Sequence, residues 1–175
     1  VGHGDLRLLV LAPSSVQEMA SLTATAFDLA DIYRMPAMLL ADGALGQMME
    51  PVDFSAFEKH EIPEKPWATV GHKMAREHNI VNSLFIDPQV LEDSVRARYK
   101  RYDMVEEKEV RYEEFSTDDA DIVLVAFGIT ARICKSAVTA AREKGIKAGL
   151  LRPITLWPFP KKPIAAVADH AKALL

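Results

Sequence analysis

The sequence predicts an α/β fold made of two incomplete parallel-sheet units that a mixed, partly helical connector joins. Near the start of the chain, the short apolar runs 6–11 and 37–41 flank a segment with helical spacing of its apolar residues. Near the end, the runs 121–127 and 146–151 flank a second segment of the same kind. Residues 54–120 between them lack this order. Continuous apolar strands that alternate with amphipathic helices are typical of parallel sheets covered on both faces.

The first unit is predicted to run strand, helix, strand. The run 6–11 is short and apolar, and Pro13 ends it. Ser15 and Glu18 then predict a capping box, in which each side chain satisfies an exposed backbone N–H group of the other residue. The helix that follows carries apolar residues three and four positions apart on one face. The run 37–41 is the second strand, and the connection between the two parallel strands should be right-handed.

The connector mixes irregular chain with one long helix. Residues 54–67 contain two prolines and predict an irregular segment. Residues 72–82 are compatible with a short helix or a loop, and 82–86 with a strand. From Pro88 onward, apolar residues at helical spacing run through a dense mixture of charges, which predicts a long helix. We interpret these charges as a solvated face rather than as a binding stripe.

The second unit repeats the strand–helix–strand pattern. The run 121–127 is the first strand, and Gly128 turns the chain into a helix expected at 131–144. Gly145 suits the C-terminal cap of that helix. The run 146–151 is the second strand.

The nonapeptide RPITLWPFP at 152–160 follows, and it contains three prolines. Proline lacks the N–H group that a strand ladder needs, so we expect no regular pairing there, and we expect a last helix at 162–173. Trp157 and Phe159 are either core anchors or an exposed interface patch. Arg152 either binds an anion or pairs with a carboxylate of the chain, and we favour the pairing.

Both units look unfinished. An all-apolar strand needs neighbours on both sides, and each unit offers only two strands, whose outer edges stay open. A half of about 55 residues would also bury only about 60% of its unfolded surface. We therefore expect the chain to be a fragment of a longer polypeptide, or a subunit that other chains complete.

Composition argues against several classes of function. The chain has 175 residues and a net charge of −4, with both signs mixed, so nothing favours nucleic acid or an acidic membrane surface. No apolar run reaches the roughly 18–20 residues that span a bilayer, and we expect a cytoplasmic protein. The single cysteine, Cys134, allows no disulfide within the chain and no cysteine-based zinc or iron–sulfur site by itself. The five histidines form no HExxH motif, so we expect no metal site.

The candidate site is the loop DGALGQMMEP at 42–51, which follows a predicted parallel strand at its carboxyl end. Ligands bind at that end of open α/β sheets. The alternative is that Asp42 accepts hydrogen bonds from its own turn while Gly43 supplies a positive φ. The glycine spacing of a phosphate-binding loop is absent. We take as candidate interface or crevice residues Asp42, Gly43, Leu45, Gln47, Glu50, Arg152 and Trp157.

Four stretches together resemble a known family: GDLRLLVLAPSSVQEM, FDLADIYRMPAMLLADGALGQMMEPV, ADIVLVAFGITARICKSAV and GLLRPITLWPFP. They resemble the α-type subunit of 2-oxoacid:ferredoxin oxidoreductases, and most of all its branched-chain (3-methyl-2-oxobutanoate) type. By this resemblance, residues 1–53 are the last part of a pyrimidine-binding domain of a thiamine enzyme. Residues 54–117 are the connector, and residues 118–175 are the first part of a domain like the C-terminal domain of transketolase.

The resemblance implies an oxidoreductase that decarboxylates a 2-oxoacid on thiamine diphosphate, transfers the acyl group to coenzyme A and passes electrons through iron–sulfur clusters to ferredoxin. It implies an oligomer with a β-type thiamine-binding subunit, which would hold the diphosphate and Mg²⁺, and a ferredoxin-like subunit. The family's activating glutamate has no counterpart here, so no catalytic residue is carried over. By this reading the chain holds no cofactor and is inactive alone. The alternative is a non-catalytic interaction or scaffold fragment.

Overall fold

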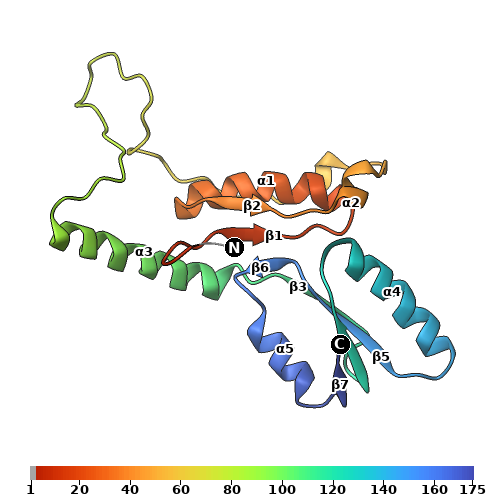
Figure 1. Ribbon diagram of the computed structural model, residues 1–175. Helices are drawn as coiled ribbons and strands as arrows, with labels where there is room; N and C mark the ends of the chain where they lie inside the picture. Colours follow the sequence, from red (N-terminus) through yellow and green to blue (C-terminus); the bar gives the residue numbers. More distant parts are fainter. Residues whose placement is uncertain (1–2) are drawn as a thin grey trace.

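Two mixed sheets form the centre of the computed structural model, which describes residues 3–175 and confirms the predicted α/β class (Figure 1). Sheet A has the strand order β2-β1-β6, and sheet B has the order β3-β5-β4-β7. In chain order the elements are β1 Leu9–Leu11, α1 Val16–Tyr33, β2 Ala37–Leu39, α2 Gly43–Gln47, the short 3-10 helix η1 Phe54–Ala56, α3 Pro88–Lys108, β3 Tyr112–Phe115, β4 Ile122–Val125, α4 Gly128–Glu143, β5 Ala148–Pro153, β6 Thr155–Trp157, α5 Lys161–Ala168 and β7 Ala173–Leu174.

Sheet A combines strands from both ends of the chain. β1 pairs with β2 in parallel, as predicted, and with β6 in antiparallel orientation, with Val10 opposite Trp157. The Ala12 N–H group donates to the Ile154 carbonyl at 2.8 Å and extends this pairing. All residues of β1 are buried. The second half of the chain (β3 to β7) therefore supplies a strand to the first half (β1 to α2).

This pairing corrects the prediction that RPITLWPFP stays outside the sheets. β5 runs to Pro153, and β6 follows after one residue. The physical reason is position: Pro153 ends one strand, Pro158 follows the next, and Pro160 precedes α5. The residues of β6 between these prolines keep their N–H groups, so β6 can pair with β1.

Sheet B is larger than the two predicted strands. β4 pairs in parallel with β5 and with β7, and β3 pairs with β5 in antiparallel orientation. The sequence analysis missed β3, since its residues Tyr112–Phe115 alternate between exposed and half-buried and carry two glutamates. It also extended the last helix too far, because α5 ends at Ala168 and the chain then forms β7.

The connector holds one helix, α3, which begins at Pro88 as predicted, with Asp87 as its cap. The expected strand at 82–86 is not formed, because those residues are exposed and pair with no strand. Farther upstream the connector rests on α1, where His60 Nδ1 lies 3.1 Å from Asp28 Oδ2. The remainder extends from the molecule as a long loop (Figure 1).

Alternating side chains of β5 place one helix on each face of sheet B. Leu150 packs with Ala131 and Val138 of α4, whereas Leu151 packs with Val167 of α5. Adjacent residues of a strand point to opposite faces, so α4 and α5 cover different sides.

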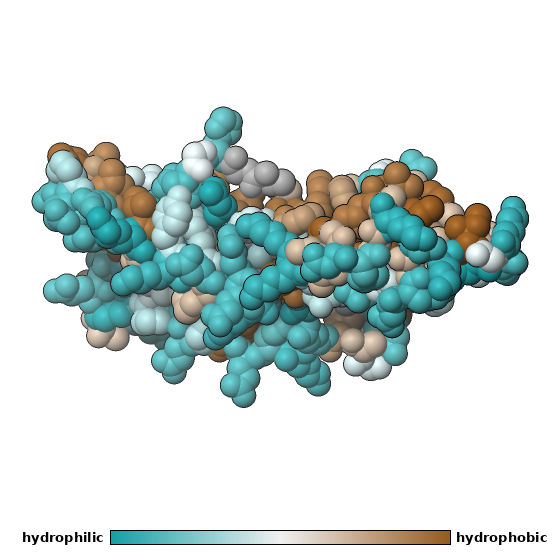
Figure 2. All heavy atoms as spheres, turned by 90° about the horizontal axis from the view of Figure 1, so that it is seen from below, coloured by the Kyte–Doolittle hydropathy of each residue, from teal (hydrophilic) through white to brown (hydrophobic). Residues whose placement is uncertain are grey.

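A third buried cluster joins both halves of the chain. Leu9 of β1, Leu29 of α1 and Val105 of α3 form it, with Trp157 of β6 packed against them. The face of the molecule seen from below is mostly hydrophilic, and apolar residues gather along one margin (Figure 2). Within residues 3–175, no helix is both long enough and apolar enough to span a membrane.

Candidate functional site

A hollow of about 470 Å³ lies where the loop after β2 meets the start of α4. Leu40, Ala41 and Asp42 line one side, and residues 125–130 line the other. β2 ends at Leu39 and β4 ends at Val125, so both parallel strands direct their carboxyl ends toward it. This is the position where open α/β sheets bind ligands or partners.

Asp42 starts the short helix α2. Its Oδ1 atom accepts a hydrogen bond from the Leu45 N–H group at 2.8 Å, and Leu45 is 2% exposed and anchors the loop. The predicted capping role of Asp42 is therefore present. The predicted positive φ at Gly43 is wrong, because the chain enters a helix there rather than a tight turn.

The loop approaches the second half of the chain at Gly128. This residue has a φ of 60°, and a Cβ atom placed on it would lie 3.8 Å from both Asp42 Oδ2 and the Pro13 carbonyl oxygen. No side chain caps the N-terminus of α4. The Asp42 carboxylate thus lies near the positive end of the α4 dipole, which favours a negative charge at that place.

Arg152 forms a buried polar link between the halves. It is 3% exposed, and its guanidinium donates two hydrogen bonds to Glu18 of α1, at 2.9 Å and 2.8 Å. It also donates to the Ser14 hydroxyl, and its Nε lies 3.1 Å from Glu113 Oε2 without hydrogen-bond alignment. Two parallel bonds between a guanidinium and a carboxylate fix geometry as well as charge. The favoured pairing of Arg152 with a carboxylate is what the structure contains.

The same contact alters the predicted capping box. Ser15 Oγ accepts from the Glu18 N–H group at 3.1 Å, as predicted, but the Glu18 carboxylate accepts from the Ser14 N–H group instead of that of Ser15. Burial raises the pKa of Glu18, but hydrogen bonds from Arg152 and Ser14 outweigh burial and hold that pKa below its ordinary value.

Glu50 makes a second link between the halves. Its Oε1 atom lies 2.7 Å from the Arg132 guanidinium of α4, and its Oε2 atom accepts from the Val16 N–H group at 3.1 Å. The hydrogen bond from Arg132 comes first among the causes that lower the pKa of Glu50. The Glu50 carboxylate therefore contacts both the N-terminus of α1 and Arg132 of α4.

Trp157 lies in β6 with its ring 5.7 Å from that of Tyr102 at an angle of 80°, an edge-to-face contact. It is half-buried against the cluster of Leu9, Leu29 and Val105. Phe159, two residues later, is 41% exposed. Trp157 is therefore a core anchor, whereas Phe159 has the exposure that the interface alternative requires.

The predicted residues divide into three groups by position. Glu50, Arg152 and Trp157 contact the other half of the chain, and Asp42 lies near Gly128. Leu45 is buried, whereas Gly43 and Gln47 are exposed. The sequence analysis treated Gly128 only as a turn and Glu18 only as a cap, and it did not single out Arg132. The position of Gly128 directly after an apolar strand could have indicated a site residue, because Asp42 has the same position in the first unit.

The residues at the hollow do not suit a magnesium diphosphate group. They offer one carboxylate, Asp42, and one hydroxyl, Thr130. Within residues 3–175, no group of three or more His, Cys, Asp or Glu side chains is placed to hold a metal ion. Magnesium in phosphate sites prefers several oxygen ligands in octahedral geometry. The arrangement is suited to joining the two halves rather than to holding that cofactor.

Comparison with protein families gives two matches that follow each other along the chain. Residues 3–116 match the thiamine diphosphate-binding family of pyruvate flavodoxin/ferredoxin oxidoreductases. Residues 120–175 match core domain II of pyruvate:ferredoxin oxidoreductase. The first match alone covers more than half of the chain.

The curated relatives are subunits of related oxidoreductases. The ketoisovalerate oxidoreductase subunit VorB of Methanothermobacter marburgensis is 51% identical over 168 residues, which are 96% of this chain and 47% of the relative. The 2-oxoglutarate synthase subunit KorA of Methanocaldococcus jannaschii is 33% identical over 180 residues, covering 90% of this chain and 49% of the relative. The chain thus spans about half the length of these relatives.

Among solved structures, the chain resembles 2-oxoglutarate:ferredoxin oxidoreductase from Magnetococcus marinus, a structure with 2-oxoglutarate, coenzyme A and succinyl-CoA bound. The TM-score is 0.71 at 21% identity, and the match covers 99% of this chain and 35% of that one. At this identity the likeness concerns the fold.

Proposed function

The chain belongs to the pyruvate flavodoxin/ferredoxin oxidoreductase family, and from this membership we propose that it is part of the α-type subunit of a 2-oxoacid:ferredoxin oxidoreductase. The reaction is the oxidative decarboxylation of a 2-oxoacid. It consumes coenzyme A, yields an acyl-CoA and carbon dioxide, and transfers two electrons to ferredoxin.

The substrate we propose is a branched-chain 2-oxoacid, namely 3-methyl-2-oxobutanoate. The observation that carries this choice is the level of identity: 51% and 50% to two ketoisovalerate oxidoreductase subunits, against 30% to 33% for the 2-oxoglutarate synthase subunits.

The role of this chain in the enzyme is architectural. It holds the end of a pyrimidine-binding domain, residues 1–53, against the start of a transketolase C-terminal-like domain, residues 118–175, with residues 54–117 between them. The links of Arg152 with Glu18 and of Glu50 with Arg132 support this role, because they cross from one part to the other. Thiamine chemistry needs a cofactor held rigidly in a crevice from which water is excluded, so rigid placement of these parts serves it.

The cofactors and partners follow from the same proposal. Thiamine diphosphate and Mg²⁺ are held mainly by a β-type subunit, and iron–sulfur clusters lie in that subunit or in a ferredoxin-like one. The complete protein is a cytoplasmic oligomer that uses coenzyme A and ferredoxin. We propose that the isolated chain is inactive, because the family's activating glutamate has no counterpart in it.

Substrate ranking tests the proposal. The complete subunit is purified with its partner subunits, and reduction of a viologen dye is measured with coenzyme A, thiamine diphosphate and one 2-oxoacid at a time. We expect kcat/KM to be highest for 3-methyl-2-oxobutanoate, above pyruvate and 2-oxoglutarate. A higher kcat/KM for 2-oxoglutarate or pyruvate would contradict the choice of substrate, and no coenzyme A-dependent reduction with any 2-oxoacid would contradict the activity.

A further inference from the structure

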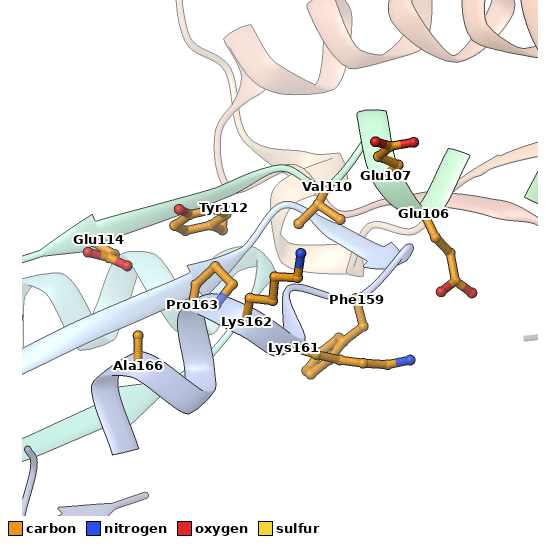
Figure 3. A pocket seen from close by; sticks show the side chains of 10 residues that line it. All are labelled: Glu106, Glu107, Val110, Tyr112, Glu114, Phe159, Lys161, Lys162, Pro163 and Ala166. Carbon is orange, nitrogen blue, oxygen red and sulfur yellow. The ribbon is translucent and has the colours of Figure 1, made fainter. Parts of the chain in front are cut away.

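A second hollow, of about 580 Å³, lies between α3, β3 and α5, but its charged side chains do not converge on it (Figure 3). Glu107 points away from the hollow, and Glu106 lies beside Lys161 at one end. All charged residues that line it are exposed. We therefore assign no ligand to this hollow. The groups that lack a partner lie in the connector instead.

Five exposed apolar side chains lie close together in residues 80–86, IVNSLFI. The exposed fraction is 82% for Ile80, 73% for Leu84 and 86% for Ile86. These residues belong to the long loop that extends from the molecule (Figure 1). Together the five side chains expose on the order of 400 Å² of apolar surface. Exposed apolar surface of this extent is typical of an interaction site.

The backbone of this segment is unpaired as well. Among the described residues, no backbone group of 80–86 forms a hydrogen bond with another backbone group. Such free N–H and C=O groups form a template for pairing with another chain. The segment is rich in β-branched and aromatic residues, which favour strands, and the sequence analysis expected a strand at 82–86. What the segment lacks is a partner strand.

A second copy of the same segment is a suitable partner. Residues 80–86 contain no charged residue, so two copies approach each other without repulsion between like charges. They also contain no proline, so the ladder of hydrogen bonds has no gap. Pairing covers about 800 Å² of apolar surface on the two copies together. With the backbone and the polar side chains added, the contact reaches the roughly 1,000 Å² that a specific interface needs.

We propose that residues 80–86 of two copies of this chain pair as antiparallel strands about a two-fold axis at Ser83. Ile80 of one copy then lies opposite Ile86 of the other, and the two apolar side chains contact each other. A contact of this symmetry closes on itself and produces a dimer. The proposal rests on this segment alone and does not require the oxidoreductase function.

The hydrogen bond at Leu84 agrees with this register. In an antiparallel pair, alternate residues direct their N–H groups toward the partner strand and the residues between them direct theirs away. The N–H groups of Val81, Ser83 and Phe85 are free to face the second copy. The N–H group of Leu84 then points away from that copy, and it already donates to Asn82 Oδ1 at 3.1 Å.

A disulfide between two copies tests the pairing. At the two-fold axis the Cα atoms of Ser83 lie about 5.5 Å apart, which a disulfide can span. The variant S83C of the complete subunit is purified with its partner subunits and treated with oxidised glutathione. We expect a covalent pair of two copies on a non-reducing gel. The parent, which retains Cys134, should form none, and neither should S136C, which places a cysteine on the exposed surface of α4.

Two outcomes of the disulfide experiment would overturn the proposal. The first is no covalent pair of copies in S83C, or a disulfide from S83C to a different subunit, which would show that another partner covers the segment. The second is an equal yield in S136C, which would show that the pair forms by random collision.

A charge placed in the contact provides a second test. In S83C/I80D an unpaired carboxylate faces Ile86 of the second copy, so disulfide formation should slow about tenfold or more. The matched control is S83C/M74D, because Met74 lies in the same loop, is 83% exposed and is outside the segment. The control should form the disulfide as S83C does, and thermal unfolding should show that both double variants are folded. An unchanged rate in S83C/I80D would overturn the proposed pairing.

Discussion

Replacing Glu18 by Gln removes the carboxylate that pairs with Arg152 and should loosen the contact between the two halves of the chain. The guanidinium is 3% exposed and donates two hydrogen bonds to Glu18. Glutamine keeps one carbonyl acceptor, and Glu113 remains 3.1 Å from Arg152 Nε, so the net loss is near one charge-assisted hydrogen bond. Such a bond contributes about 2 kcal/mol, less than the ~3–5 kcal/mol lost when a buried ion pair is broken completely.

Hydrogen–deuterium exchange of the β1 and β6 amides measures this loosening in the assembled protein. The amide of Ala12, which donates to Ile154, reports on separation of β1 from the second half of the chain. A loss of about 2 kcal/mol in the opening free energy corresponds to about 30-fold faster exchange. The control is E92Q, because Glu92 pairs with Arg96 on an exposed face of α3. It should change the opening free energy by less than about 0.5 kcal/mol.

The pH dependence gives an independent check. The pKa of Glu18 in the folded chain lies below 4.5, its ordinary value. The stability it contributes is therefore present above pH 4.5 and is lost as the pH falls through the folded pKa. The difference in exchange rate between the parent and E18Q should therefore shrink as the pH falls from 4.5 through the folded pKa of Glu18. An exchange rate in E18Q within about threefold of the parent at neutral pH would refute the role assigned to this pair.

Three further predictions concern single residues, each measured by urea unfolding of the purified chain or by titration. G149A places a Cβ atom 2.6 Å from the Ser116 carbonyl oxygen and should destabilise the fold by about 1–3 kcal/mol. In the control G43A the new Cβ atom meets nothing within 4 Å, so the free energy of unfolding should change little. Equal effects of the two substitutions would contradict the packing around Gly149. G128A should cost about 1 kcal/mol, because alanine is strained at a φ of 60°, and a stabilising effect would be inconsistent with that backbone. Burial, followed by the hydrogen bond that the Tyr33 hydroxyl donates to Glu109, raises the pKa of Tyr33 to about 12. The stability that this hydroxyl contributes should therefore be complete below pH 10 and should be lost as the pH rises through its folded pKa of about 12. Phenolate absorbance should show a step near pH 12 for one tyrosine, and this step should be absent in Y33F. A single step near pH 10 for all tyrosines would contradict the raised pKa of Tyr33.

The first half of the chain was largely predictable because its signals are local. The capping residue Ser15 and the apolar spacing after it define α1, which spans Val16–Tyr33 as expected. The apolar runs on either side gave β1 and β2, each shorter than predicted because the ladder involves only three residues in each strand.

The elements that were missed depend on distant partners. β6 forms because β1 offers an open edge far away in the sequence, and nothing local in Thr155–Trp157 reveals that edge. β3 has a charged, alternating sequence that becomes a strand only beside β5. Tertiary pairing of this kind overrides local propensity, and a proline-rich segment hides it further.

In the candidate site, too, local features could be predicted from the sequence, whereas contacts between distant residues could not. Asp42 could be placed at the carboxyl end of a strand from the sequence, but its proximity to Gly128 could not, because the two residues follow strands of different sheets. Arg152 was expected to pair with a carboxylate, but the identity of that carboxylate required the fold: Glu18 had an evident local role as a cap, which concealed its contact with β5.

The most direct test of the central claim is an omission experiment. The partner subunits are assembled with the complete subunit that contains this chain, with the 175-residue chain, or with neither, and coenzyme A-dependent viologen reduction by 3-methyl-2-oxobutanoate is measured. We predict activity only with the complete subunit, because we propose that this chain positions two domains of the enzyme and that the family's activating glutamate has no counterpart in it. Equal activity of the partner subunits without it would contradict the claim that this chain belongs to the working enzyme.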